Sequence, residues 1–397
     1  MADVLSTKET LDLFDRYVVA NYGRLPVVIV RGEGSRVWDA DGKEYLDLFA
    51  GWAVTALGHC HPRLVAAIRE QAGQLIYMAN HMYTQPQGRL AQLLSEQSFG
   101  GKCFFCNSGA EAIEAAIKLA RLHTPREKYK VLTFEDSFHG RTFGAISATA
   151  QSKYHQGFQP LLAGFEYLPL NDLDAVYGAV DDETCGILVE PIQGEGGVNV
   201  CTDEFLQGLR NLCDERGMVL MFDEVQTGVG RTGKMFAYQH SGVVPDIMTL
   251  AKHLGGGVPI GAIVAKPEVA ASMKPGTHAS TFGGNALTAA AACAVLETIL
   301  DEKLLDHVNE VGAFAMGRLR ELQQKQPKIK QVRGIGLMIG IELAVGGAAV
   351  FKKCLEKGML TNCTHDTVLR FMPSLTVTRE EVEQGIAILA EALEETE

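Results

Sequence analysis

The sequence predicts an α/β protein with a mostly parallel sheet and a smaller α+β region at its C-terminal end. Three observations support this prediction. Short apolar runs alternate with amphipathic helical stretches through the middle of the chain, glycines cluster at the turns between them, and the last hundred residues follow a different order of elements. Strands that alternate with helices are typical of βαβ units, in which helices cover both faces of the sheet.

The expected elements of the middle region follow one another along the chain. Apolar runs bounded by turn residues indicate strands, and apolar residues recurring every three or four positions indicate helices. On these patterns we expect strands at residues 103–106, 130–133, 186–190 and 218–222, and helices at residues 111–122 and 203–215.

The two ends of the chain are expected to differ from the middle. The first fifty residues contain a hairpin-like stretch, with strands near 27–30, 37–38 and 45–48 and an Asp-Gly turn at 41–42. The last hundred residues predict a helix from about 285 to 324, strands at 329–333 and 338–344, a helix near 347–357, a strand near 369–372 and a final helix from Arg379.

The bulk composition limits the classes of function. The chain has 397 residues, 47% hydrophobic and 21% charged, which is ordinary for a globular protein of about two or three domains. The net charge of −12 argues against a nucleic-acid partner, because phosphate backbones need clustered Lys and Arg. No segment reaches the roughly 20 apolar residues of a membrane span, and the first residues lack a secretory signal pattern. Nine cysteines, an odd number, favour a reduced, cytoplasmic protein.

Residues 107–111, Asn-Ser-Gly-Ala-Glu, lie between an expected strand and an expected helix. Gly109 allows a tight turn, and the free N–H groups at the start of a helix favour an anion such as a phosphate. The alternative is a plain turn in which Ser108 caps the helix. A nucleoside triphosphate is disfavoured, because no Gly-Lys-Ser/Thr follows the glycine.

Two charged residues each follow an expected apolar strand. Asp223 closes the run 218–222, where a buried carboxylate needs a partner: a protonated ring nitrogen, a metal or a structural arginine. Lys252 follows the run 248–251 and comes shortly before three glycines. A partly desolvated lysine has a lowered pKa and can attack a carbonyl, although an ordinary surface lysine is the alternative.

Residues 138–141, Phe-His-Gly-Arg, supply an aromatic ring and a guanidinium. Phe138 can stack on a planar ligand, and Arg141 can hold a carboxylate through two parallel hydrogen bonds, with a structural ion pair as the alternative. None of these segments is decisive alone. Together they supply what pyridoxal phosphate needs: a phosphate seat, a wall for the ring, an acid for the pyridinium nitrogen and a lysine for the aldehyde.

With these motifs the sequence resembles the class III aminotransferases of fold type I, and among them those that act on acetylornithine. The resemblance covers nearly the whole chain, and its most specific motifs are EPIQGEGG at 190–197, DEVQTG at 223–228 and TLAK at 249–252. It implies a seven-stranded, mostly parallel sheet in a large cofactor-binding domain at residues 51–285. It also implies a small α+β domain at 286–397, against which an N-terminal segment, residues 1–50, packs.

The resemblance implies a set of contacts to pyridoxal 5'-phosphate. Lys252 would hold the aldehyde and move the proton, and Asp223 would keep the pyridinium nitrogen protonated. The remaining implied contacts are Gly109 and Ala110 to the phosphate, Phe138 to the ring, Gln226 to the phenolic oxygen, and Thr281 to the phosphate of the other subunit. The contact of Thr281 implies a homodimer with shared active sites.

The resemblance also implies the reaction, which belongs to arginine biosynthesis. The terminal amino group of N-acetylornithine would pass to 2-oxoglutarate, giving N-acetylglutamate semialdehyde and glutamate. Arg141 would bind the carboxylate of the acylated ornithine, and Arg370 the α-carboxylate of glutamate or 2-oxoglutarate. Glu195 would pair with Arg370 when that α-carboxylate is absent, because an unpaired buried charge is costly. Ser280, Trp52 and Tyr22 would lie near the substrate.

Other functions stay open at this point. Trp52 and Tyr22 depart from the expected pattern and leave ornithine, succinylornithine and 4-aminobutyrate as rival donors, and the fold also serves decarboxylases and aminomutases. A non-catalytic relative is disfavoured by the intact Lys252 and Asp223, and a nucleotide-dependent enzyme by the missing Gly-x-Gly-x-x-Gly. His253 stands where a smaller residue is expected.

Three further patterns are interpreted as structural, and no metal site is expected. Cys103 and Cys106 have the spacing of redox or zinc sites, but a strand points them to opposite faces. The His-Cys-His sequence at 59–61 lies in a turn typical of the family. The residues Glu111, Glu114 and Lys118 are expected to form a solvated helix face with an i,i+4 ion pair.

Overall fold

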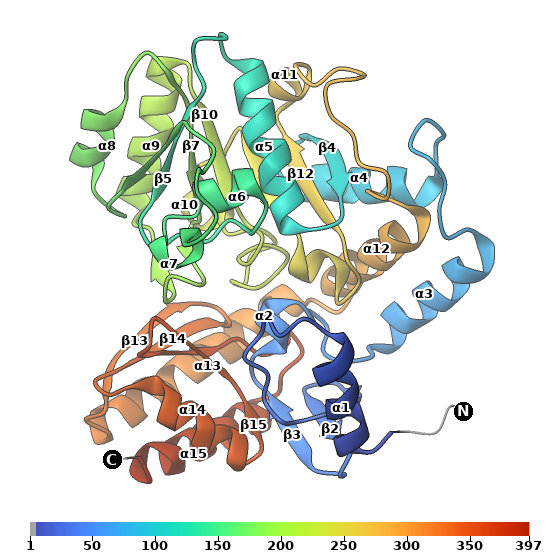
Figure 1. Ribbon diagram of the computed structural model, residues 1–397, viewed down its shortest axis with the longest axis vertical. Coiled ribbons are helices and arrows are strands. Elements are labelled where there is room, and N and C mark those ends of the chain that lie inside the picture. Colours follow the sequence, from blue (N-terminus) through green and yellow to red (C-terminus); the bar gives the residue numbers. More distant parts are fainter. Residues whose placement is uncertain (1–4, 397) are drawn as a thin grey trace.

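The structure is a computed structural model that describes residues 5–396, and its largest sheet has seven strands (Figure 1). Neighbouring strands from β11 to β6 run parallel, whereas β12 is antiparallel to both of its neighbours. The predicted mostly parallel sheet is therefore confirmed. In spatial order the strands are β4 (Lys102–Cys106), β12 (Gly261–Ala265), β11 (Ile247–Leu250), β10 (Val219–Asp223), β7 (Thr184–Val189), β5 (Lys130–Phe134) and β6 (Phe165–Leu168).

Helices cover both faces of this sheet, so its central strands are buried along their whole length. Side chains alternate between two cores along β10. Val219 and Met221 belong to the core that includes α5 (Gly109–His123), while Leu220 and Phe222 belong to the one that includes α9 (Asp203–Arg216). This explains why these strands read as continuous apolar runs in the sequence.

The other helices of this region are α3 (Pro62–Gln74), α4 (Gln85–Gln97), α6 (Phe143–Ala148), α7 (Ser152–His155), α8 (Leu173–Ala179), α10 (Tyr238–Ser241), α11 (Pro267–Ala270) and α12 (Ala286–Asp301). The prediction of one helix from about 285 to 324 is wrong. Two helices, α12 and α13 (Leu304–Lys325), occupy this stretch, because Lys303 between them has a left-handed backbone with φ 53°.

The C-terminal region forms its own antiparallel sheet, β13 (Ile329–Ile335), β14 (Met338–Leu343), β17 (Val368–Phe371) and β16 (Asn362–Thr364), with helices α14 (Gly347–Glu356) and α15 (Arg379–Glu394). The smaller α+β region is therefore confirmed. None of the helices within residues 5–396 combines the length and the apolar composition needed to cross a bilayer.

The N-terminal segment shares a sheet with the C-terminal region (Figure 1). After α1 (Thr7–Tyr17), strands β1 (Ile29–Glu33), β2 (Arg36–Asp39) and β3 (Glu44–Asp47) pair in order, and β15 (Met359–Leu360) adds to β3 in parallel. The pairing of β3 with β15 joins this segment to the C-terminal region, and the packing of residues 1–50 with a small domain stays a prediction. The boundaries near residues 50 and 285 stay a prediction.

Candidate active site

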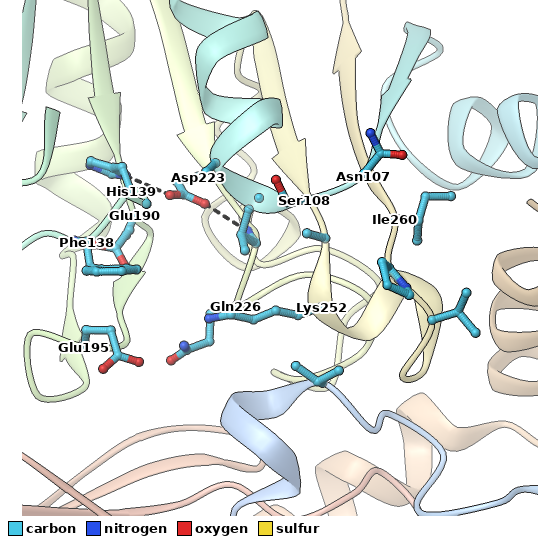
Figure 2. Close-up of a pocket in the computed structure, with 18 of the residues that line it drawn as sticks. Asn107, Ser108, Phe138, His139, Glu190, Glu195, Asp223, Gln226, Lys252 and Ile260 are labelled. Atoms are coloured by element: carbon cyan, nitrogen blue, oxygen red, sulfur yellow. Dashed lines mark hydrogen bonds and ion pairs between the residues drawn. The ribbon is translucent and has the colours of Figure 1, made fainter. Parts of the chain in front are cut away.

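A cavity of about 350 Å³ opens where β4, β5, β7, β10 and β11 end (Figure 2). These strands share one orientation, so their carboxyl ends meet at one edge of the sheet, where ligands of α/β proteins gather. Val54, just after the turn α2 (Ala50–Ala53), also lines the cavity. Seven of the sequence-predicted residues line it: Gly109, Ala110, Phe138, Glu195, Asp223, Gln226 and Lys252.

The start of α5 forms one end of the cavity. Ser108 caps the helix, since the backbone N–H of Glu111 donates to its hydroxyl at 3.2 Å. The N–H groups of Gly109 and Ala110 donate to no acceptor within residues 5–396. A Cβ added to Gly109 would lie 2.9 Å from Val225, so the glycine allows this close approach. These free N–H groups at a helix start can bind an anion.

Asp223 ends β10 and is held by three hydrogen bonds. Its Oδ1 accepts from the backbone N–H of Val225 at 3.0 Å and from the hydroxyl of Thr249 at 3.2 Å. Its Oδ2 lies 2.7 Å from Nδ1 of His139, whose side chain is fully buried (Figure 2). A carboxylate oxygen accepts this bond from the Nδ1–H of His139, which fixes the orientation of Asp223.

Glu190 is a second buried acid at the cavity, and its environment differs from that of Asp223. The backbone N–H groups of Phe138 and Gly194 donate to it at 3.1 and 3.3 Å, and burial raises its pKa to about 7. No role was predicted for His139 or Glu190 from the sequence. Both residues belong to motifs named above, His139 to the segment 138–141 and Glu190 to the segment 190–197. No sequence pattern shows, however, that His139 faces Asp223, 84 residues away.

Lys252 follows β11 and begins the short 3₁₀ turn η1 (Lys252–Gly255). Its φ of 43° is left-handed, a strained conformation for a residue with a side chain. Burial lowers the pKa of its amine, which forms no hydrogen bond or ion pair among the described residues. A partly desolvated, unpaired amine is suited to attack on an aldehyde.

Glu195 and Arg370 pair beside Lys252. Arg370 lies on β17 with its side chain fully buried, and its Nη1 and Nη2 donate to the two Glu195 carboxylate oxygens at 2.7 and 3.2 Å. Asn362 accepts from Nε of Arg370 at 2.7 Å. Burial alone would raise the pKa of Glu195, but the neighbouring Arg370 holds it below its usual value.

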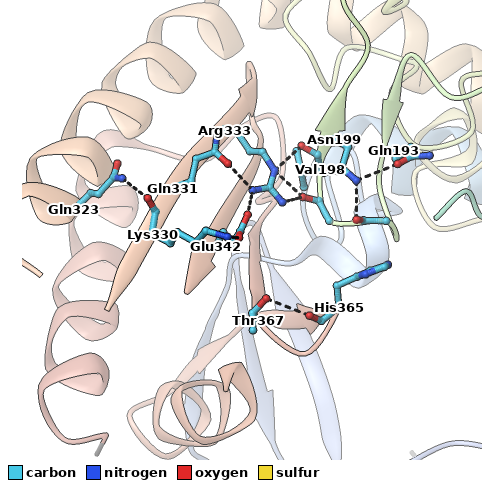
Figure 3. Close-up of polar contacts among 12 residues, drawn as sticks. Gln193, Val198, Asn199, Gln323, Lys330, Gln331, Arg333, Glu342, His365 and Thr367 are labelled. Carbon is cyan, nitrogen blue, oxygen red and sulfur yellow. Dashed lines mark hydrogen bonds and ion pairs between the residues drawn. The ribbon is translucent and has the colours of Figure 1, made fainter. Parts of the chain in front are cut away.

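Arg333 fixes the loop that carries Glu195 (Figure 3). It extends from β13 and donates to the carbonyl of Gly197 at 2.7 Å and to that of Val198 at 3.2 Å. These residues precede β9 (Asn199–Val200), which pairs with β8 (Ile192–Gln193). The C-terminal region therefore supplies both the partner of Glu195 and the support for its loop.

Arg141 lies outside the cavity wall, and its guanidinium is exposed. It stacks over the ring of Tyr154 at 4.0 Å and lies 5.6 Å from the ring centre of Phe138. Within residues 5–396 it has no ion-pair partner. Arg141 is thus the arginine near the site that is free to take an anion.

Besides Arg141 and Arg370, four predicted residues do not line the cavity of their own chain: Tyr22, Trp52, Ser280 and Thr281. Tyr22 and Trp52 are 65% and 49% exposed, and Trp52 lies in the turn α2, where all four residues have left-handed φ values. Ser280 accepts hydrogen bonds from Asn107 at 3.2 Å and Gly283 at 3.1 Å. Thr281 is exposed on the loop that follows.

The structure answers two of the questions raised by the sequence. The prediction of a solvated helix face at Glu111, Glu114 and Lys118 is wrong. Glu114 accepts from the hydroxyl of Thr142 at 2.6 Å and from the N–H of Gly144 at 2.8 Å, so it holds the start of α6. Its neighbours are engaged too, since Glu111 accepts from Asn107 and Lys118 lies 2.9 Å from His278. His59 lies 2.8 Å from Asp47 at the end of β3, so the turn at 59–61 makes a structural contact with this strand.

Known proteins resemble this chain along almost its whole length. The family model described as Aminotransferase class-III matches residues 17–393. An acetylornithine aminotransferase of Caldanaerobacter subterraneus subsp. tengcongensis is 53% identical over 385 residues, covering 96% of this chain and 98% of that protein.

Solved structures agree with the family match. The ornithine aminotransferase of Toxoplasma gondii ME49 has a TM-score of 0.94 at 37% identity, covering 98% of this chain and 96% of that one. The acetylornithine aminotransferase of Elizabethkingia anophelis has a TM-score of 0.89 at 34% identity, covering 99% and 100%. The chain therefore belongs to the class III aminotransferases, enzymes that use pyridoxal 5'-phosphate.

Proposed function

We propose that this enzyme transfers the terminal amino group of N-acetylornithine to 2-oxoglutarate. The observation that carries this proposal is the state of two arginines, Arg370 next to Lys252 and Arg141 outside the cavity wall. Arg370 is paired with Glu195, whereas Arg141 is exposed and has no ion-pair partner within residues 5–396. A substrate with a distant carboxylate, such as an acylated ω-amino acid, can use Arg141 without breaking the buried pair. The 53% identity to an acetylornithine aminotransferase supports the same donor.

The cavity fits pyridoxal 5'-phosphate in four respects. The free N–H groups of Gly109 and Ala110 suit its phosphate, and the amine of Lys252 suits its aldehyde. Asp223 suits a protonated ring nitrogen. The buried Oε1 of Gln226 has no hydrogen-bond partner within residues 5–396, so this amide is available to the cofactor. When bound, the cofactor supplies an aldehyde that carries the amino group and a protonated ring that withdraws electrons.

The residues around the cofactor have separate tasks in this proposal. Asp223, oriented by His139, holds the proton at the ring nitrogen, and Phe138 covers the ring. Nζ of Lys252 takes the proton from the carbon that bears the transferred amino group, and returns it on the reverse course. Its lowered pKa suits this task, because a neutral amine is needed to accept a proton near neutral pH.

Glu195 and Arg370 allow one cavity to take two unlike substrates. While N-acetylornithine is bound, the pair stays closed, and Arg141 holds the distant carboxylate. When glutamate or 2-oxoglutarate enters, its α-carboxylate replaces Glu195 on Arg370. The exchange leaves Arg370 with an anion throughout, which avoids the several kcal/mol that an unpaired buried charge costs.

The proposal includes a homodimer in which Thr281 of each subunit reaches the phosphate bound by the other. Thr281 is exposed and does not line the cavity of its own chain. The adjacent Phe282 is exposed, and so are four large apolar side chains in the segment 76–83: Ile76, Met78, Met82 and Tyr83. An apolar surface of this kind marks a subunit contact.

A cytoplasmic location also belongs to the proposal, supported by nine cysteines that are all free.

Kinetics with four donors test the substrate. Purified holoenzyme is assayed with N-acetylornithine, N-succinylornithine, ornithine and 4-aminobutyrate, with 2-oxoglutarate as acceptor. We expect N-acetylornithine to have the highest kcat/KM, by more than about tenfold over ornithine, which corresponds to about 1.4 kcal/mol. The second candidate is ornithine, which the bulky Trp52 beside the cavity favours; a higher kcat/KM for ornithine would reverse the assignment.

A second experiment tests the assignment of the cofactor. Lys252→Ala must abolish both the activity and the visible absorption of the lysine-bound cofactor. Wild-type protein that lacks this absorption after incubation with pyridoxal 5'-phosphate would contradict the cofactor assignment itself.

A further inference from the structure

Two strained turns lie against each other next to the cavity. In the first, Lys252 has φ 43°, and in the second, Val229 and Gly230 have φ values of 60° and 89°. A left-handed Lys or Val persists only where the surroundings hold it. The side chain of His253, which directly follows Lys252, joins the two turns.

The hydrogen bonds of His253 define its protonation. The imidazole is buried, with Nδ1 3.2 Å from the carbonyl of Val229 and Nε2 2.7 Å from Nη2 of Arg231. A carbonyl can only accept and a guanidinium can only donate. Nδ1 therefore carries the proton, Nε2 accepts, and the ring is neutral. Burial, together with the charge of Arg231, holds the pKa of His253 well below its usual value.

Arg231 depends on this acceptor. Its side chain is fully buried, and within residues 5–396 no carboxylate pairs with it. Besides His253, it donates from Nη1 to the carbonyl of Leu337 at 3.0 Å, and the N–H of Leu337 donates back to its carbonyl at 3.1 Å. A buried cation without a counter-charge is costly unless hydrogen bonds satisfy it.

The contact with Leu337 reaches into the C-terminal region. Leu337 lies in the turn between β13 and β14, and a Cβ on the adjacent Gly336 would lie 2.5 Å from the backbone of Thr232. The turn is thus packed closely against the chain next to Arg231. A continuous path of contacts runs from this turn through Arg231 and His253 to Lys252.

We propose that His253 is a positioning residue for Lys252, fixing the direction of its amine by tying the Lys252 turn to Val229 and Arg231. The proposal rests on the proposed role of Lys252. His253 does not line the cavity, so it acts through the backbone of its neighbour. The neutral imidazole is required, since only this form offers both a donor and an acceptor.

Two substitutions separate the two hydrogen bonds. In His253→Asn the amide N–H replaces Nδ1 and retains the bond to Val229, but Arg231 loses its acceptor. In His253→Gln the longer side chain places an oxygen near the position of Nε2 and restores that acceptor. We expect His253→Asn to lower kcat by about 10- to 100-fold in both half-reactions with KM within about twofold, the effect of a reacting group misplaced by about 1 Å.

The Gln variant and a spectroscopic readout distinguish positioning from folding. We expect His253→Gln to recover kcat to within about fivefold of wild type. The pH midpoint of the absorption of the lysine-bound cofactor should shift in His253→Asn and return in His253→Gln, because this midpoint reports the surroundings of the Lys252 nitrogen. The control is His307→Asn, which removes the hydrogen bond from His307 on α13 to the carbonyl of Val377. It should leave kcat and the midpoint unchanged.

Two results would contradict a positioning role of His253. A His253→Asn enzyme with wild-type kcat per bound cofactor and wild-type midpoint, even at lower thermal stability, would make His253 purely structural. If neither single variant folds, the double variant Arg231→Met, His253→Leu removes the charge and its acceptor together. Wild-type kcat in this variant, or its failure to fold, contradicts the proposal. Failure of the proposed function is distinct, because it would appear in the wild-type enzyme, as a preference for another donor or as no transfer at all.

Discussion

Arg370 and Glu195 are joined by two hydrogen bonds of 2.7 and 3.2 Å, and the arginine side chain is wholly buried. Glu195→Gln keeps the shape of this pair but removes its charge. We expect KM for glutamate to fall by about five- to tenfold, because the α-carboxylate no longer competes with an anion, and kcat/KM for N-acetylornithine to fall by a similar factor. Single-turnover rates with each donor measure the two half-reactions separately.

The control for this prediction is Glu310→Gln, in which another Glu partner of an arginine, Arg379, loses its charge outside the cavity. It should change both half-reactions little. Equal effects of Glu195→Gln on the two half-reactions would exclude the exchange of carboxylates at Arg370.

Arg141 should determine the binding of the acylated donor. Arg141→Met is expected to raise KM for N-acetylornithine by about 10- to 100-fold, the loss of a charged hydrogen bond, while KM for glutamate changes less than about threefold. Lys153→Met is the matched control, because Lys153 also lies over the ring of Tyr154, at 5.0 Å. Steady-state kinetics with both donors measure the difference. The same rise in KM for both donors would place Arg141 in a general structural role.

Glu224 should make stability depend on pH. It is buried, accepts from the N–H of Tyr238 at 2.8 Å, and burial raises its pKa to about 7. The unfolded chain loses this proton near its ordinary value of 4.5, so the folded state binds the extra proton between these pH values. The contribution to the free energy of unfolding is therefore complete below pH 4.5 and is lost as pH rises through about 7.

Glu224→Gln removes this titration. The free energy of unfolding of wild type minus that of the variant should decrease between about pH 5 and 8, by on the order of 3 kcal/mol, and then stay constant. Urea denaturation at several pH values measures it. A difference independent of pH would show that Glu224 is ionised in the folded protein throughout.

Mixed dimers test the shared active site. A Lys252→Ala subunit lacks the lysine, and a Thr281→Asp subunit repels the phosphate bound by its partner. If Thr281 acts across the interface, a mixed dimer gathers both defects in one site and leaves the other site intact. Equal mixing should then restore about a quarter of the wild-type activity, because half of the dimers are mixed and each has one intact site. If Thr281 acts within its own chain, mixing restores nothing.

The parts of the site that could be predicted from the sequence follow from the sheet. Asp223 and Lys252 end parallel strands, so both had to lie at one edge, and periodic apolar runs located those strands. Helix α1 was not predicted, although Ser6 and Glu9 form a capping box at its start; none of its residues is buried. The break at Lys303 depends on one backbone angle that no residue type in that stretch indicates.

Contacts between distant segments could not be predicted. His139 contacts Asp223 across 84 residues, and Arg231 contacts Leu337 across 106. Glu114 has the spacing of a solvated ion pair, yet it faces a loop that begins 28 residues later. Such contacts depend on how elements pack in space, and local periodicity carries no information about them.

The strand β15 gives the chain an unusual order of assembly. Leu46 pairs with Met359, so the sheet formed by the first fifty residues is completed by a strand near the other end of the chain. During synthesis β3 leaves the ribosome long before its partner, and its outer edge stays open to other strands. Premature release before Met359 therefore yields a fragment whose open edge favours association between chains.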